Sequence, residues 1–250
     1  MRIFITGVSS GIGNALVKCL IIRGHEVWGI ARRLDALEKL AKEVDSPAFN
    51  FDCCDITDAV ANERLRTKMV SQKYVPDVVI LNAAVDIEDA YPGLDFDHAT
   101  QMMRTNVDGA NFWVTAFIET FFQRDAGQFI AVSSIFAHWP DPASVSYSSS
   151  KAALSMLFRG LRIRYRKTNL QFKLLYLGPV DTPINPRFEG KESSGSLILA
   201  SAPNTADYIA NLIASKRSSS YYPLYIYGIF LFLCWLPDNW FELITSRFKR

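Results

Sequence analysis

The chain has 250 residues and a formal net charge of +2, with 27 Lys and Arg against 25 Asp and Glu. Because this charge is small and no long basic run precedes the C-terminus, the sequence gives no argument for a nucleic-acid partner. Apolar residues make up 49% of the chain, which is enough for one large core, and no linker divides the chain into two domains.

Cysteine usage gives no indication of a metal centre. Cys19, Cys53, Cys54 and Cys234 lack metal-ligand spacing, and the adjacent pair is unsuited to an ordinary structural disulfide. Scattered cysteines are typical of a reducing compartment. The chain also begins at once with a strand-like run at 2–6, in place of a secretory leader. We therefore predict a cytoplasmic protein.

Apolar β-branched runs alternate with helix-periodic segments from residue 2 to about 180. This alternation predicts an α/β fold, a Rossmann-like doubly wound parallel sheet flanked by helices in a single domain. The expected strands are 2–6, 26–31, 47–51, 77–81, 127–132 and 171–177. The expected helices are 12–23, 35–44, 57–72, 98–123, 147–167 and 204–216.

The first expected strand runs into a glycine-rich turn, Thr6-Gly7-Val8-Ser9-Ser10-Gly11-Ile12-Gly13. Glycines let the backbone approach a pyrophosphate, which the N-terminal amides of the next helix can bind. Turns after strands are often rich in glycine, so the position at the first strand-to-helix junction carries the argument. The turn predicts a dinucleotide site formed by Gly7, Ser9, Ser10, Gly11, Ile12 and Gly13.

The residues after the second strand bear on the choice of cofactor. An NAD-binding chain presents an acidic residue about 20 residues past the glycines, but this chain has Arg32 and Arg33. Guanidinium groups bind a 2′-phosphate through charge-assisted hydrogen bonds, whereas a carboxylate repels it. The alternative is that both arginines are only solvated loop residues. We predict NADP(H) in preference to NAD(H).

Three later segments are expected to border the same site. Asp55 and Ile56 follow the third strand, where a carboxylate can accept a hydrogen bond from the adenine amino group. After the fourth strand, the small residues in Asn82-Ala83-Ala84 allow the backbone to lie close to a ligand. Asn106 is a polar amide within the expected helix 98–123, where it can bend the helix or bind internal water.

Tyr147 and Lys151 stand four residues apart at the start of an expected helix, so their side chains share one face. A phenol exchanges protons poorly near neutral pH unless a neighbouring cation favours its anion. Ser134 follows the strand 127–132 and offers a hydroxyl that can hold a carbonyl oxygen. Taken alone, such residues are often ordinary turn and cap residues. Together they suggest carbonyl reduction or alcohol oxidation.

The chain resembles the short-chain dehydrogenase/reductase family, in its single-domain branch, over residues 2 to about 182. The matching residues are Thr6-Gly7 with Gly11 and Gly13, Asp55, Asn82-Ala83-Ala84, Asn106, Ser134, Tyr147 with Lys151, and Gly178-Pro179-Val180-Asp181-Thr182. Two departures stand out, because Ala84 replaces a usual glycine and Gly178-Pro179 reverses the usual order. The resemblance implies a sheet of about seven strands.

The resemblance also implies roles for the site residues. The tyrosine at Tyr147 transfers a proton, and the lysine at Lys151 lowers the pKa of that tyrosine and holds the nicotinamide ribose. The serine at Ser134 orients the carbonyl, and the asparagine at Asn106 supports a water relay. The residues expected at the nicotinamide end of the cofactor are Pro179, Val180 and Thr182. Family members commonly pair through the two long helices, which implies a homodimer or homotetramer.

The composition changes sharply beyond Arg217. There is no charge from 218 to 237, and the run 224–236 is almost wholly apolar. The last segment, 240–250, combines aromatic residues with Arg and Lys, as helices in a lipid headgroup region do. We expect a catalytic domain at 1–217, with its last strand at 219–225, and a hydrophobic, amphipathic extension at 218–250.

Several roles are open for this extension. The apolar run is shorter than the ~20 residues that a spanning helix needs, so a span is the least favoured. Peripheral membrane contact through 221–250 is favoured over a dimer interface or packing on the protein's own core. An apolar segment beside the site can supply an apolar substrate.

These observations predict an NADP(H)-dependent oxidoreductase that interconverts a small-molecule carbonyl and a secondary alcohol. The apolar extension tilts the expected substrate toward an apolar or lipid-like one. The alternative from another class is a catalytically silent NADP(H)-binding sensor or scaffold at a membrane.

Overall fold

The computed structural model describes residues 1–89, 92–184, 199–225 and 228. Seven parallel strands form the main sheet in the order β3-β2-β1-β4-β5-β6-β9. Their bounds are β1 Arg2–Thr6, β2 Glu26–Ala31, β3 Phe49–Cys53, β4 Val78–Leu81, β5 Gly127–Ser134, β6 Leu170–Leu177 and β9 Ser219–Tyr222. The prediction of a Rossmann-like doubly wound parallel sheet is confirmed.

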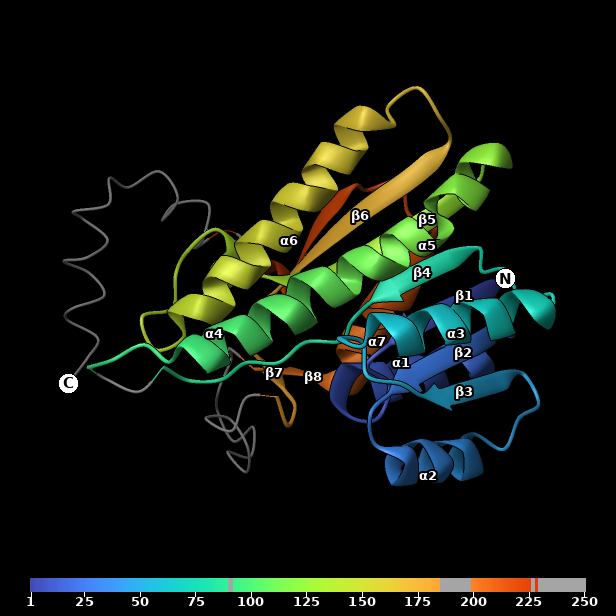
Figure 1. Cartoon of the computed structure of the whole chain (residues 1–250), viewed down its shortest axis with the longest axis horizontal. Coiled ribbons are helices and arrows are strands. Elements are labelled where there is room, and N and C mark those ends of the chain that lie inside the picture. The colour runs from blue at the N-terminus through green and yellow to red at the C-terminus, as the bar shows by residue number, and fades with distance from the viewer. Residues whose placement is uncertain (90–91, 185–198, 226–227, 229–250) are drawn as a thin grey trace.

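Helices cover both faces of this sheet (Figure 1). Their bounds are α1 Gly11–Ile22, α2 Leu34–Val44, α3 Ala59–Ser71, α4 Phe96–Met103, α5 Gly109–Gln123, α6 Val145–Arg164 and α7 Ala202–Ala214. In the view of Figure 1, α3, α5 and α6 lie in front of the sheet, whereas α1 and α7 lie behind it. This is the layering that crossover helices give a parallel sheet.

The sheet separates two apolar cores. On β1, Phe4 belongs to the core under α3, α5 and α6, and its ring centroid lies 4.3 Å from that of Trp113 on α5. Its neighbours Ile3 and Ile5 belong to the core shared with α1, α2 and α7. All three strand residues are fully buried. A strand buried on both faces therefore reads as a continuous apolar run, because alternate side chains enter different cores.

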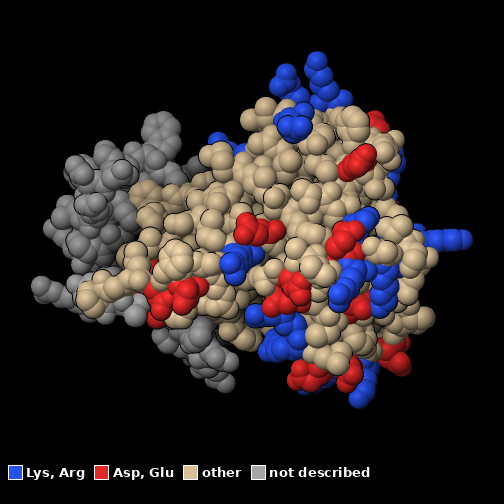
Figure 2. All heavy atoms as spheres, viewed as in Figure 1, with Lys and Arg blue, Asp and Glu red and all other residues tan. Residues whose placement is uncertain are grey.

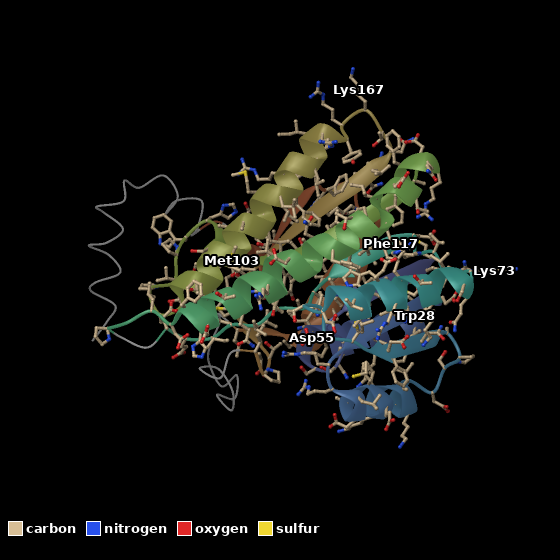
Figure 3. The ribbon with its side chains drawn as sticks, in the orientation of Figure 1. Trp28, Asp55, Lys73, Met103, Phe117 and Lys167 are labelled. Atoms are coloured by element: carbon tan, nitrogen blue, oxygen red, sulfur yellow. The ribbon has the colours of Figure 1, made fainter. Side chains whose placement is uncertain are left out.

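The helix expected at 98–123 runs without a break from Phe96 to Gln123, but it is not α-helical throughout. A π-helical segment, Arg104–Asp108, separates α4 from α5. Gly109 begins α5 and packs closely against Ile56. A Cβ at Gly109 would lie 2.6 Å from Cγ1 of Ile56. Phe117, further along α5, packs against the sheet (Figure 3). The π-helical segment thus changes the helix geometry where Asn106 stands.

Two ends of the last α/β unit differ from expectation. The last strand of the main sheet ends at Tyr222, not at 225, because Pro223 has no N–H to donate to the sheet. The helix before it begins at Ala202, since the Ser201 hydroxyl accepts a hydrogen bond from the Asn204 amide at 3.3 Å.

A second, two-stranded sheet was not foreseen from the sequence. It pairs β7 Val180–Asp181 with β8 Ala200–Ser201 in parallel. Residue 200 thus returns to the loop after β6, which lies at the carboxyl edge of the main sheet. The small sheet fixes that loop beside the site described below.

Most of the C-terminal extension lies outside the described residues, and the expected apolar helical segment, dimer contact and membrane contact fall there. Within the described ranges, none of the helices combines the length and apolar character needed to cross a membrane. On the face shown in Figure 2, Lys and Arg are interspersed with Asp and Glu, in keeping with the small net charge.

Candidate active site

A cavity of about 600 Å³ opens at the carboxyl edge of the parallel strands. Ligands of doubly wound folds bind at this edge, where the loops after the strands meet. Asp55 lies there, beyond the carboxyl end of β3 (Figure 3). Of the predicted site residues, all but Gly13 and Asn106 line the cavity. Those lining it are Gly7, Ser9, Ser10, Gly11, Ile12, Arg32, Arg33, Asp55, Ile56, Asn82, Ala83, Ala84, Ser134, Tyr147, Lys151, Pro179, Val180 and Thr182.

The glycine-rich turn needs its glycines for close packing. Gly7 has a φ of +78°, and a Cβ there would lie 2.7 Å from Cα of Ala83. A Cβ at Gly13 would lie 2.1 Å from the carbonyl oxygen of Gly7. The side-chain nitrogen of Asn82 donates to the carbonyl oxygens of Thr6 at 3.1 Å and Gly7 at 3.0 Å. Gly13 therefore acts on the cavity indirectly, by allowing α1 to start against the turn.

The N-terminus of α1 fits a phosphate group. Ser10 occupies the cap position, but its side chain caps no amide, and the first turn carries no acidic residue. The backbone amides of this turn are thus available at the cavity, where the helix dipole favours an anion. A dinucleotide pyrophosphate matches this environment.

Two guanidinium groups stand at the end of β2. Arg32 and Arg33 are both exposed and both line the cavity. The Arg33 guanidinium donates to the Ser9 hydroxyl at 3.0 Å, which joins the end of β2 to the glycine-rich turn. Asp35 lies in the first turn of α2, whose N-cap residue is Arg33. Both arginines can therefore bind a phosphate beside Ser9.

Asp55 and Asp58 divide two tasks after β3. The Asp58 carboxylate accepts hydrogen bonds from the amides of Val60 and Ala61, so it caps α3. The Asp55 carboxylate accepts bonds from the amide of Thr57 at 2.9 Å and from its hydroxyl at 2.8 Å. These bonds orient Asp55 at the cavity wall.

The loop after β6 is held at both sides. The Gly178 amide donates to the carbonyl oxygen of Tyr222 on β9 at 2.9 Å, and the Ala200 amide donates to that of Pro179 at 3.1 Å. Because residue 178 is glycine and not proline, it keeps the N–H that makes the first bond. The reversed Gly-Pro order thus ties Val180 and Thr182 to the cavity through β9 and β8.

Ser134, Tyr147 and Lys151 meet at the cavity. Ser134 ends β5 and is 6% exposed, while Lys151 is 2% exposed. Tyr147 lies in the first turn of α6 and is half-buried. The Lys151 ammonium lies 5.6 Å from the centroid of the Tyr147 ring and donates to the carbonyl oxygen of Val132 at 3.0 Å. The three side chains thus converge from the β5 end and one face of α6.

Burial has the largest effect on the pKa values of Tyr147 and Lys151. It raises the pKa of the Tyr147 phenol, the Asp86 carboxylate raises it further, and a hydrogen bond with Ser134 lowers it. Burial lowers the pKa of Lys151 to about 8, against the opposing effect of Asp86. Burial, Asp86 and Ser134 are therefore the causes that shift the pKa of Tyr147 in this structure, and the lowering by Lys151 that the resemblance implies stays a prediction.

Asn106 stands behind the cavity and supports it. Its side-chain oxygen accepts from the Val85 amide at 2.8 Å. Its side-chain nitrogen donates to the Val85 carbonyl oxygen at 2.9 Å and to the Ser150 hydroxyl at 2.9 Å. Asn106 is 1% exposed. It joins the loop after β4 to the helix that carries Tyr147 and Lys151.

Sequence reasoning missed polar residues in the cavity wall, of which Asp86 is the most consequential. Its carboxylate accepts a hydrogen bond from the Ser144 hydroxyl at 2.6 Å. The available signal was an acidic residue two positions after Ala84, the last of the small residues that follow the fourth strand. The other unforeseen polar residues in the wall include Gln101 and Asp141.

Comparison with known proteins gives the family. The model of the short chain dehydrogenase family matches residues 1–193. An uncharacterized oxidoreductase of Staphylococcus haemolyticus is 30% identical over 183 residues, which cover 73% of this chain and 79% of the relative. A serine 3-dehydrogenase of Rhizobium radiobacter is 30% identical over 214 residues, which cover 84% of this chain and 85% of the relative.

Solved structures agree on the fold. The closed form of a serine dehydrogenase complexed with NADP+ has a TM-score of 0.81 and 17% identity, covering 88% of this chain and 94% of that chain. A 4-hydroxyisoleucine dehydrogenase complexed with NADH has a TM-score of 0.75 and 18% identity, covering 88% and 95%. The sequence matches show the family, whereas these structures, at 17% and 18% identity, show the fold. The chain belongs to the short-chain dehydrogenase family and is an NAD(P)-dependent oxidoreductase.

Proposed function

We propose that this chain uses NADP(H) to interconvert a carbonyl and a secondary alcohol, with Tyr147 as proton donor and acceptor. The observation that carries the proposal is one cavity of about 600 Å³ whose wall contains Ser134, Tyr147 and Lys151 together with the glycine-rich turn. A phosphate-binding turn and a proton-transferring phenol in one cavity suit hydride chemistry.

The nicotinamide cofactor, when bound, supplies or accepts the hydride at the substrate carbon. In carbonyl reduction, the Tyr147 hydroxyl donates its proton to the carbonyl oxygen, and in alcohol oxidation the phenolate takes that proton back. The Ser134 hydroxyl donates a hydrogen bond to the same oxygen and stabilises its developing charge. The Lys151 ammonium favours the phenolate and offers donors to the cofactor ribose.

Arg32 and Arg33 support NADP(H) as the cofactor. Both guanidinium groups are exposed at the cavity, and the Arg33 group already bonds to Ser9 in the phosphate-binding turn. A 2′-phosphate at this place can accept charge-assisted hydrogen bonds from both. Similar folds occur with NADP+ and with NADH, so the arginines carry this part of the proposal. Pro179, Val180 and Thr182 would border the nicotinamide end.

Two features of the chain bear on the substrate class. The expectation of an apolar or lipid-like substrate rests on the apolar segment after residue 224, most of which lies outside the described residues. The wall also contains the polar residues Asp86, Gln101 and Asp141, and one relative is a serine 3-dehydrogenase. A substrate panel should therefore span small hydroxy amino acids as well as lipid-like ketones and alcohols. The intact Ser134, Tyr147 and Lys151 set favours turnover over a silent sensor or scaffold.

The proposal is tested by following NADPH and NADH turnover against that panel in the wild type and in Tyr147→Phe. We expect Tyr147→Phe to lose at least ~100-fold in kcat, the usual size of a general acid-base contribution, with NADPH still bound. Tyr165→Phe, at the C-cap residue of α6, is the matched control, since the Tyr165 ring packs against Phe172 and Phe tolerates that contact. Activity that survives undiminished in Tyr147→Phe would overturn the mechanism.

A further inference from the structure

We propose that Asp86 is a positioning residue that holds Tyr147 and Lys151 in their proton-donating forms. The proposal deepens the proposed function and rests on it, because it assigns an electrostatic role beside the proton-transferring phenol. Asp86 lines the same cavity as Tyr147 and Lys151.

The backbone that carries Asp86 is held in place by buried polar groups. The preceding residue, Val85, has both its amide and its carbonyl bonded to the side chain of Asn106. The carboxylate of Asp86 accepts a 2.6 Å hydrogen bond from Ser144, which is fully buried and occupies the cap position of α6. The carboxylate is therefore fixed to the start of the helix that carries Tyr147 and Lys151.

Further bonds along the same loop reinforce this placement. The Ser144 hydroxyl also lies 3.3 Å from the carbonyl oxygen of Ile87. The Asp89 amide donates to the carbonyl oxygen of Ala143 at 3.0 Å, and the Asp89 carboxylate accepts from the Val145 amide at 2.7 Å. Because the loop is tied to α6 at several points, the carboxylate of Asp86 is preorganised toward the helix.

The charges around the pair explain why a carboxylate is useful there. Lys151 is 2% exposed. Burying an ammonium costs free energy unless the group is paired and hydrogen-bonded. The Val132 carbonyl oxygen supplies one bond at 3.0 Å. Asp86 supplies opposite charge, which favours the ammonium form.

The same carboxylate acts on both proton-bearing groups. Its charge raises the pKa of Lys151 against the lowering effect of burial, and it raises the pKa of Tyr147 together with burial. The hydrogen bond from Ser134 opposes it at Tyr147. The other charged residues in the described cavity wall are Arg32, Arg33, Asp55 and Asp141. Asp86 is the charged residue among them that shifts both groups in the direction of protonation.

The test is Asp86→Asn, which removes the charge and keeps an oxygen that can accept the bond from Ser144. We expect the pH at which carbonyl reduction declines on the alkaline side to fall by about one unit, the usual scale for a neighbouring charge. Asp89→Asn is the matched control, because it removes one charge from the same loop outside the cavity wall. It is expected to leave the pH profile in place. An unshifted profile in Asp86→Asn, or an equal shift in Asp89→Asn, would overturn the proposal.

A second measurement needs no substrate and separates this proposal from the function itself. Asp86 raises the folded-state pKa of Lys151. The contribution of this interaction to the unfolding free energy is therefore present below that pKa and is lost as the pH rises through that pKa. The difference in unfolding free energy between wild type and Asp86→Asn should thus shrink as the pH rises through about 8. A difference that stays constant across this range argues against Asp86 acting on Lys151, whether or not a substrate is turned over.

Discussion

Asn106 and Ser150 are joined by a 2.9 Å hydrogen bond between the Asn106 side-chain nitrogen and the Ser150 hydroxyl. The bond connects the π-helical segment Arg104–Asp108 to α6, the helix of Tyr147 and Lys151. With the two bonds to Val85, it makes Asn106 the point at which the loop after β4, the π-helical segment and α6 meet.

Asn106→Ala should destabilise the protein and disturb the cavity. The substitution removes three hydrogen bonds and leaves the backbone groups of Val85 unpaired, which we expect to cost about 2–4 kcal/mol of unfolding free energy. Urea unfolding measures this loss. Asn111→Ala, at an exposed position of α5, should change the free energy by less than about 0.5 kcal/mol. Equal effects of the two substitutions would contradict the role given to Asn106.

Gly13→Ala should weaken both the fold and cofactor binding. The added Cβ would lie 2.1 Å from the carbonyl oxygen of Gly7, so α1 or the turn must shift. Thermal unfolding and an NADPH titration should both report the change. Gly160→Ala is the matched control within α6, because its Cβ meets no atom within 4 Å. That control should stabilise the protein by up to about 1 kcal/mol, since alanine is the better helix former.

The double substitution Arg32→Ala/Arg33→Ala should change cofactor preference. We expect the Kd for NADPH to rise by about 10- to 100-fold through lost charge-assisted bonds, with the Kd for NADH almost unchanged. Fluorescence titration with both cofactors gives the ratio. Arg66→Ala removes an arginine that pairs with Glu63 on α3 and serves as the control. A ratio of the two constants that does not move would remove the argument for NADP(H).

Lys173 should make stability depend on pH. Its ammonium is buried on β6 and donates to the carbonyl oxygens of Leu212, Ile213 and Ser215 at 2.9, 3.0 and 2.6 Å. Burial lowers the pKa of Lys173 to about 8, from 10.5. Between these values the unfolded chain binds more protons than the folded chain, so the contribution of this group to stability rises with pH.

Comparison of wild type with Lys173→Met isolates this effect. Urea unfolding between pH 7.5 and about 10.5 should show the wild type gaining free energy relative to the variant, as the linkage relation requires. Lys167→Met is the control, because Lys167 is exposed beyond the end of α6 (Figure 3). Parallel curves for wild type and Lys173→Met would show that Lys173 does not titrate in this way.

Much of the fold could be predicted because its signals are local. The apolar runs gave six strands of the main sheet to within about two residues, the usual uncertainty of element ends. The π-helical segment within the expected helix 98–123 could not be predicted, because the contacts of Asn106 are made with distant parts of the chain. Asn106 bonds to Val85, which is 21 residues away, and to Ser150, which is 44 residues away. Periodicity within one helix carries no record of such bonds.

By itself, the sequence determined the α/β class, the glycine-rich turn and the chain order of Ser134, Tyr147 and Lys151, because periodicity and motif spacing are properties of neighbouring residues. Only the tertiary structure decided that Asn106 supports the cavity from behind, that Asp86 enters its wall, and that burial raises the pKa of Tyr147. These facts depend on which segments fold together and on how much water they exclude, so they arise only when distant parts of the chain meet.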